Sequence, residues 1–173
     1  FVADGFDKDQ EFAPALDDVE RIQAIDLHVT TLAAKTLLES APDLSWVYLQ
    51  HTDDIGHRDG DGQAMDLAVR WVDARIHDLW SAVQARQQQA VNEDWLVIIT
   101  TDHGRTASDG KGHGGQSDRE RTIWIASNTP RMVSPRGRSA AIVDIYPTIV
   151  EHMHFDLPDE TAKKLEGQSL LSE

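Results

Sequence analysis

The feature that most constrains the fold is the run Trp-Leu-Val-Ile-Ile-Thr at residues 95–100, the most hydrophobic stretch of the chain. Its apolar side chains do not alternate with polar ones, a pattern typical of a parallel strand that is covered on both faces. Such a strand needs helices on both sides of its sheet. The sequence therefore favours an α/β fold with a mostly parallel sheet flanked by helices.

The remaining segments agree with this fold class. Apolar residues recur at helical spacing in three segments, which predict helices over residues 17–40, 64–90 and 144–152. Short runs rich in aromatic and β-branched residues predict two further strands, over residues 44–49 and 122–126. Stretches rich in Asp and Gly predict loops over residues 51–62 and 102–121.

Three strands make a thin sheet, since a typical sheet has about five or six. We therefore expect strands to be missing, and the domain to be incomplete within these 173 residues. The start of the chain at Phe1, without an initiator Met, fits a sequence that begins inside a longer protein. An incomplete sheet would expose an edge strand, which invites self-association.

Composition narrows the classes of partner. The chain has 16 Lys and Arg against 30 Asp and Glu, a formal charge of −14, which argues against nucleic acid or an anionic membrane as the main partner. No apolar run approaches the roughly 20 residues that a membrane span requires, so we expect no membrane insertion. The absence of Cys excludes thiolate metal ligands and cysteine nucleophiles.

Two clusters that can carry chemistry directly follow predicted strands. The first holds Asp53 and His57, and the second holds Asp102 and His103. The carboxyl ends of parallel strands form the edge at which open α/β sheets hold their ligands. Gly104 gives the second cluster the backbone freedom that two adjacent residues need to face one site. We therefore expect both clusters to lie at one rim of the sheet.

A third histidine, His113, lies in the Gly-rich stretch 112–115 and could reach the same rim. Each cluster alone could be a solvated turn, but three of them in this arrangement favour a metal site. Asp and His without Cys suit a borderline divalent ion, with Zn²⁺ favoured and Mn²⁺ as the alternative.

The order of these motifs resembles the alkaline phosphatase superfamily, and within it the type I phosphodiesterase/nucleotide pyrophosphatase branch. The motifs are Asp-Xaa-Xaa-Gly-His from Asp53, Thr-Asp-His-Gly from Thr101 and Gly-His-Gly-Gly from Gly112. The tail is also similar, since residues 143–149 and 165–170 resemble the closing helix and Gly-Xaa-Ser-Leu turn of that superfamily. The resemblance implies an alkaline-phosphatase-like fold.

The resemblance also implies a site with two divalent metal ions. Asp53, His57 and His113 would hold one ion, and Asp102 and His103 would hold the other. In the family the second ion also binds an Asp and a Ser or Thr nucleophile that precede these motifs, and nothing before Asp53 matches that pattern. Residues 1–173 would then be the C-terminal portion of a single catalytic domain, with the nucleophile outside the chain.

The implied activity is metal-dependent hydrolysis of a phosphate diester or monoester, with a phosphorylated small molecule as substrate. Arg105 and Lys111 flank the ligands and are candidates to bind substrate phosphate, with a role as solvated loop cations as the alternative. A sulfatase, a phosphoryl or phosphoethanolamine transferase, and a non-catalytic metal-binding module remain alternative functions. The resemblance weakly favours a location outside the cytoplasm.

Several residues close in sequence to the candidate ligands are not expected to bind metal themselves. His51 is expected to be structural, with a hydrogen bond to a metal ligand as the alternative, and Asp54 is expected to contact either a ligand or solvent. Thr101 is the nearest substitute for the absent nucleophile, although the family does not use that position. The acidic stretch 59–62 lacks the 12-residue loop and terminal Glu of a Ca²⁺ site.

Overall fold

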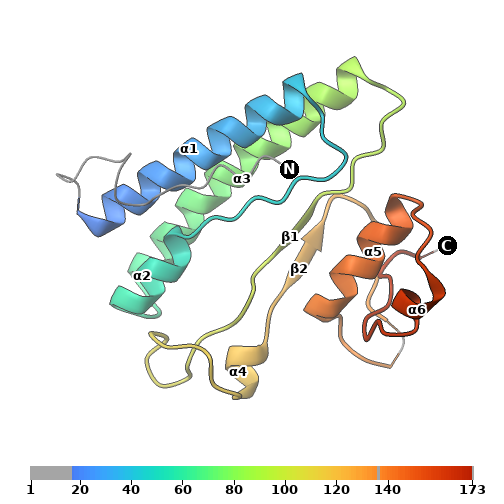
Figure 1. The fold of residues 1–173 in the computed structure, drawn as a ribbon. Coiled ribbons are helices and arrows are strands. Elements are labelled where there is room, and N and C mark those ends of the chain that lie inside the picture. The colour runs from blue at the N-terminus through green and yellow to red at the C-terminus, as the bar shows by residue number, and fades with distance from the viewer. Residues whose placement is uncertain (1–16, 136, 173) are drawn as a thin grey trace. The chain divides into compact units, whose positions relative to one another are not determined.

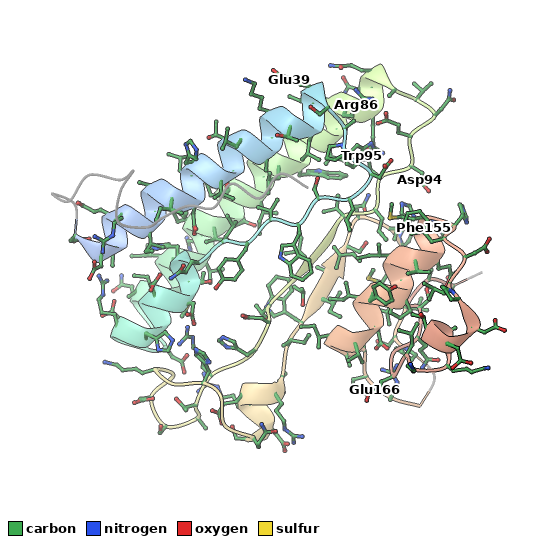
Figure 2. The ribbon with its side chains drawn as sticks, in the orientation of Figure 1. Glu39, Arg86, Asp94, Trp95, Phe155 and Glu166 are labelled. Carbon is green, nitrogen blue, oxygen red and sulfur yellow. The ribbon has the colours of Figure 1, made fainter. Side chains whose placement is uncertain are left out.

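The computed structural model describes residues 17–135 and 137–172, which form two compact units. We call the described residues up to Asp94, together with Thr106–Gly112, the helical unit. Trp95–Arg105 and the described residues from His113 onward form the sheet unit. Asp94 and Trp95, labelled in Figure 2, mark the first point at which the chain passes from one unit to the other.

Three helices build the helical unit: α1 (Asp18–Glu39), α2 (His51–Asp59) and α3 (Gln63–Gln89). In Figure 1, α1 lies along α3, and α2 contacts both of them. The Asp17 side chain caps α1 by accepting a hydrogen bond from the Glu20 N–H at 2.8 Å. The helices predicted over residues 17–40 and 64–90 are therefore confirmed.

The core of the helical unit lies where these helices meet. The buried residues of α1 recur at intervals that place them on one face of the helix: Ile22, Asp26, Thr30 and Leu37. From α3 the small side chains of Ala68 and Ala82 are buried, together with Val83. Small residues allow two long helices to approach closely, which explains how α1 and α3 pack along their length.

The strand predicted over residues 44–49 is wrong. This segment forms no strand ladder, and most of its side chains are exposed, with Trp46 87% accessible and Leu44 59%. Its aromatic and β-branched composition favours an extended backbone, but a strand also needs a neighbour to accept its hydrogen bonds. Within the helical unit the described residues provide no such neighbour.

The loop predicted over residues 51–62 is also wrong, because residues 51–59 form α2. Asp53 and Asp54 lie in the first turn, where carboxylates complement the positive end of the helix dipole. Gly60 ends the helix with a φ of 72°. The Asp residues that indicated a loop therefore stabilise the start of a helix.

The sheet unit contains one pair of short strands among its described residues, β1 (Ile98–Thr100) and β2 (Ile125–Ser127). They pair antiparallel, with Ile99 opposite Ala126. Asn128 extends the pairing beyond β1, since its side chain accepts from the Val97 N–H and donates to the Trp95 carbonyl, each at 2.8 Å. The content of helix and strand agrees in part with an α/β fold, whereas a mostly parallel sheet is not confirmed.

Short helices complete the sheet unit. The loop predicted over residues 102–121 ends in a single helical turn, α4 (Asp118–Arg121). A 3₁₀ turn, η1 (Ile142–Asp144), leads into α5 (Ile145–His152), and α6 (Asp159–Ala162) follows. The helix predicted over residues 144–152 is confirmed, with Pro147 in its first turn. Among the described residues, no helix combines the length and apolar character needed to cross a membrane.

The buried carboxylate of Asp144 organises the C-terminal part of the sheet unit. Its oxygens accept hydrogen bonds from the Arg138 guanidinium at 2.6 and 2.7 Å, and from the N–H groups of Ala141 at 2.8 Å and Gln168 at 2.9 Å. One turn later, the Thr148 hydroxyl accepts from the Leu170 N–H at 2.9 Å. Together these bonds fasten the last residues of the chain to α5 and to the turn before it.

Candidate metal centre

In the helical unit, α2 carries the first pair of predicted ligands. Asp53 and His57 are four residues apart, so the helical repeat places them on the same face. Asp53 Oδ2 lies 3.5 Å from His57 Nε2, and the two side chains are 28% and 48% exposed. A carboxylate and an imidazole are thus close together and accessible from solvent.

In the sheet unit, the loop after β1 carries the second set. Asp102 Oδ1 lies 3.6 Å from His103 Nε2, and the Nδ1 of His103 lies 2.9 Å from the Gly104 carbonyl oxygen. The rings of His103 and His113 stack with their centroids 3.8 Å apart and their planes 18° from parallel. The structure therefore brings Asp102, His103 and His113 together within one unit.

Gly104 and Glu120 hold this loop in place. The Gly104 N–H donates to the Glu120 carbonyl at 2.8 Å, and a Cβ added at Gly104 would lie 2.0 Å from the Arg119 carbonyl oxygen. The Glu120 carboxylate accepts from the Gly115 N–H at 2.9 Å and from the Ser117 hydroxyl at 2.5 Å. These bonds hold the pKa of the Glu120 carboxyl below its usual value, the Ser117 hydroxyl contributing most.

The two candidate phosphate-binding cations lie in different units. Arg105 is half-buried at the end of the first segment of the sheet unit. Lys111 is exposed in the loop Thr106–Gly112 of the helical unit, and its N–H donates to Asp109 Oδ1 at 3.0 Å. The pKa of Asp59, at the end of α2, is lowered mainly by its hydrogen bond with Arg58 and in smaller part by the charge of Lys111.

The loop that carries Lys111 rests against the end of α2. The Asp61 N–H donates to the Asp109 carbonyl oxygen at 3.4 Å. A Cβ added at Gly60 would lie 2.0 Å from the same oxygen, so only glycine allows this approach. The loop that carries Lys111 is therefore held against the end of α2 within the helical unit.

Sequence reasoning missed two residues that support these ligands, Asp26 and Glu120. Asp26 of α1 accepts hydrogen bonds from the first N–H groups of α2, and Glu120 fastens the loop of the sheet unit as described above. His51 is 2% exposed and packs edge-on against Trp71, with the ring centroids 5.1 Å apart, and burial lowers its pKa. Its expected structural role agrees with this packing. Only the helical spacing in 17–40 hinted that Asp26 faces the core.

The donor set of each unit fits a divalent ion. Within the helical unit an imidazole and a carboxylate adjoin each other, and within the sheet unit two imidazoles and a carboxylate do so. Nitrogen and oxygen donors without sulfur suit Zn²⁺ and Mn²⁺. Each unit alone offers fewer protein ligands than the four positions of a tetrahedral zinc site.

A comparison with protein families gives a match to most of the chain. The family of type I phosphodiesterases and nucleotide pyrophosphatases matches residues 2–165, which is most of the chain. A comparison with curated proteins gives no significant match. The matched range contains every residue of both donor sets. The chain therefore belongs to the type I phosphodiesterase/nucleotide pyrophosphatase family, within the alkaline phosphatase superfamily.

Proposed function

We propose that this chain supplies metal ligands and phosphate-binding cations to a phosphoric ester hydrolase with a two-metal site. The observation that carries the proposal is the match to a family of phosphate ester hydrolases over residues 2–165. The adjoining Asp–His pairs at the motif positions of each unit support it. The substrate class is a phosphorylated small molecule, either a diester or a monoester.

The ligands divide into two sets. By the family's motif pattern, Asp53, His57 and His113 are assigned to one ion, and Asp102 and His103 to the other. Zn²⁺ is the favoured ion and Mn²⁺ the alternative. When bound, a pair of such ions supplies Lewis acidity that neutralises charge on the attacking and leaving oxygens.

The chain's own cations bind the substrate. Phosphoryl transfer depends mainly on positioning and on neutralising the charge of the phosphate oxygens. The Arg105 guanidinium can donate two parallel hydrogen bonds to a phosphate, whereas the Lys111 ammonium acts as a point charge. Arg105 follows His103 by two residues and Lys111 precedes His113 by two, and this closeness in sequence to the proposed ligands supports the assignment.

The nucleophile is assigned to a part of the protein outside these 173 residues. The family uses a Ser or Thr together with an Asp that precede the motifs, and nothing before Asp53 in the sequence matches that pattern. This chain alone should therefore hydrolyse bis(4-nitrophenyl) phosphate at a negligible rate in the presence of Zn²⁺. Robust metal-dependent turnover would contradict this placement of the nucleophile, and Thr101 would become the first candidate.

Metal binding by the chain tests the ligand assignment directly. Isothermal titration with Zn²⁺ should show that His57→Ala and His113→Ala each weaken binding by about tenfold or more, because each removes a ligand. His77, an exposed histidine on α3 outside the motifs, provides the matched control. If His77→Ala weakens binding as much as His57→Ala, the binding is unspecific and the assignment is wrong.

A further inference from the structure

The start of α2 is capped by a residue of another helix. Gln50 at the N-cap has a helical backbone conformation, and its side chain makes no capping hydrogen bond. Instead, the carboxylate of Asp26 on α1 accepts from the Gln50 N–H at 3.0 Å and from the His51 N–H at 2.8 Å. Each oxygen takes one bond, so the carboxylate grips two of the N–H groups that a helix start leaves without a partner.

Burial strengthens this contact. Asp26 is 1% exposed and His51 is 2% exposed, so water has little access to the bonds between them. Hydrogen bonds to an ionised carboxylate are stronger than neutral ones, and a negative charge at a helix N-terminus is further stabilised by the helix dipole. His51 also packs against Trp71 of α3, so the first turn of α2 is held from both neighbouring helices.

The predicted ligands follow directly from this anchored turn. The Asp53 N–H donates to the Gln50 carbonyl oxygen at 2.9 Å, so the residue gripped by Asp26 also fixes the backbone of Asp53. His57 lies one turn further along the same helix, 3.5 Å from Asp53. A change at the start of α2 would therefore move both side chains together relative to α1 and α3.

We propose that Asp26 is a positioning residue that holds α2, and with it Asp53 and His57, in the orientation that metal binding requires. The inference rests on the proposed function, because it concerns the ligands assigned there. Asp26 acts on them through the backbone N–H groups of Gln50 and His51, from which its carboxylate accepts hydrogen bonds.

Asp26→Asn tests the inference, because it keeps the size of the side chain and one acceptor oxygen but turns an NH₂ group toward a backbone N–H. Amide hydrogen exchange across α2 should accelerate by about tenfold or more, since a hydrogen bond to a charged group is lost. Exchange in α3 should change much less. Zn²⁺ affinity, measured by calorimetry, should fall by about tenfold, a typical loss when a residue that orients ligands is removed.

Thr30→Ala is the matched control. Thr30 is also buried on α1, at 1% exposure, but its hydroxyl donates to the Asp26 carbonyl oxygen within α1 itself. Its removal should destabilise the helical unit without releasing the start of α2, so Zn²⁺ affinity should stay near the wild-type value. If Asp26→Asn does not fold, Gln50→Pro removes one of the two N–H donors while leaving the carboxylate in place.

The outcomes separate the two proposals. Unchanged exchange in α2 of the Asp26 variant would overturn the positioning role. Faster exchange with a Zn²⁺ affinity equal to that of Thr30→Ala would also overturn it, because capping would then serve stability alone. A wild-type chain that binds no Zn²⁺ would overturn the ligand assignment, and exchange in α2 would then decide by itself whether Asp26 holds the helix.

Discussion

The two units present an Asp–His pair in different ways. In the helical unit, Asp53 and His57 are four residues apart on α2, so the repeat of the helix sets their spacing. In the sheet unit, Asp102 and His103 are adjacent in a loop, and His113 reaches them from ten residues later. One contact that fixes a helix also fixes both of the ligands on it. A loop needs a separate contact wherever its backbone changes direction.

The two units can also be compared by their buried aspartates, each of which anchors a distant part of the backbone. Asp26 and Asp144 are 1% and 0% exposed, and each accepts hydrogen bonds from backbone N–H groups that include one 24 residues further along the chain. Asp26 anchors the helix with the predicted ligands, while Asp144 anchors the C-terminal segment through Gln168. The carboxylate therefore has the same structural use in both units, but only in the helical unit does it bear on the candidate site.

The largest effect should come from the loop of the sheet unit. In Gly104→Ala the new Cβ would lie 2.0 Å from the Arg119 carbonyl oxygen and 2.9 Å from that of Thr122. Both are backbone atoms, so the loop must move, and we expect a loss of about 3 kcal/mol in the free energy of unfolding. Urea denaturation measures this loss, and the stacking of His103 on His113 should be lost with it.

Gly112→Ala is the control for this change, in the loop of the helical unit. There the Cβ would lie 3.0 Å from Cγ2 of Thr106, a side-chain atom rather than backbone, and a shift of a few tenths of an ångström would relieve the contact. We expect a loss below about 1 kcal/mol. Equal losses in the two variants would mean that the loop of the sheet unit is no more constrained than that of the helical unit, and the contrast would not hold.

The sequence predicts the long helices α1 and α3 well and the strands poorly, for a physical reason. Apolar periodicity over some twenty residues depends on the segment alone, and α1 and α3 follow it closely. A strand depends on a partner elsewhere in the chain, so the composition of 44–49 indicates an extended backbone without saying what would pair with it. The same limit explains why residues 95–100 suggested a parallel strand, whereas β1 pairs antiparallel with β2.

The candidate ligands could be selected from residue type and spacing, but the residues that hold them could not. Asp53 with His57, and Asp102 with His103, are close in sequence, so their proximity within each unit follows from short spacing. The contact of Asp26 with residues 50 and 51 joins two helices, and the bond of Gly104 to Glu120 joins two ends of a loop. Such long-range contacts leave no local pattern in a single sequence.

The pH dependence of stability in the sheet unit should give a smaller effect than Gly104→Ala. The Arg138 guanidinium, with backbone N–H groups of Gln168 and Ala141, lowers the pKa of Asp144 from 3.8 to about 2. Because the folded state holds the ionised carboxyl more strongly than the unfolded state, this stabilisation is full above pH 4 and is lost as the pH falls toward 2. The shift corresponds to about 2 kcal/mol.

Asp144→Asn isolates this contribution, since asparagine does not titrate. At neutral pH the variant should be less stable than the wild type by about 2 kcal/mol in urea denaturation, and the difference should shrink between pH 4 and 2. Asp26→Asn should instead act mainly on hydrogen exchange in α2. A constant difference between Asp144→Asn and the wild type across this pH range would show that Asp144 stabilises the fold without its charge.

The smallest loss of stability should come from replacing a helix N-cap, and each unit offers one such residue. Ser117 caps α4 in the sheet unit, where its hydroxyl also donates to Glu120, and Asp17 caps α1 in the helical unit. Ser117→Ala and Asp17→Ala should each reduce stability by about 1 kcal/mol, the usual cost of a lost N-cap.

The local consequences of these two changes should differ, because Glu120 also fastens Gly104 and Gly115. Ser117→Ala should therefore accelerate amide exchange at Gly104, next to His103, whereas Asp17→Ala should affect only the start of α1 and leave α2 protected. Unchanged exchange at Gly104 would mean that the loop of the sheet unit keeps its shape without this cap, and that its ligands do not depend on Ser117.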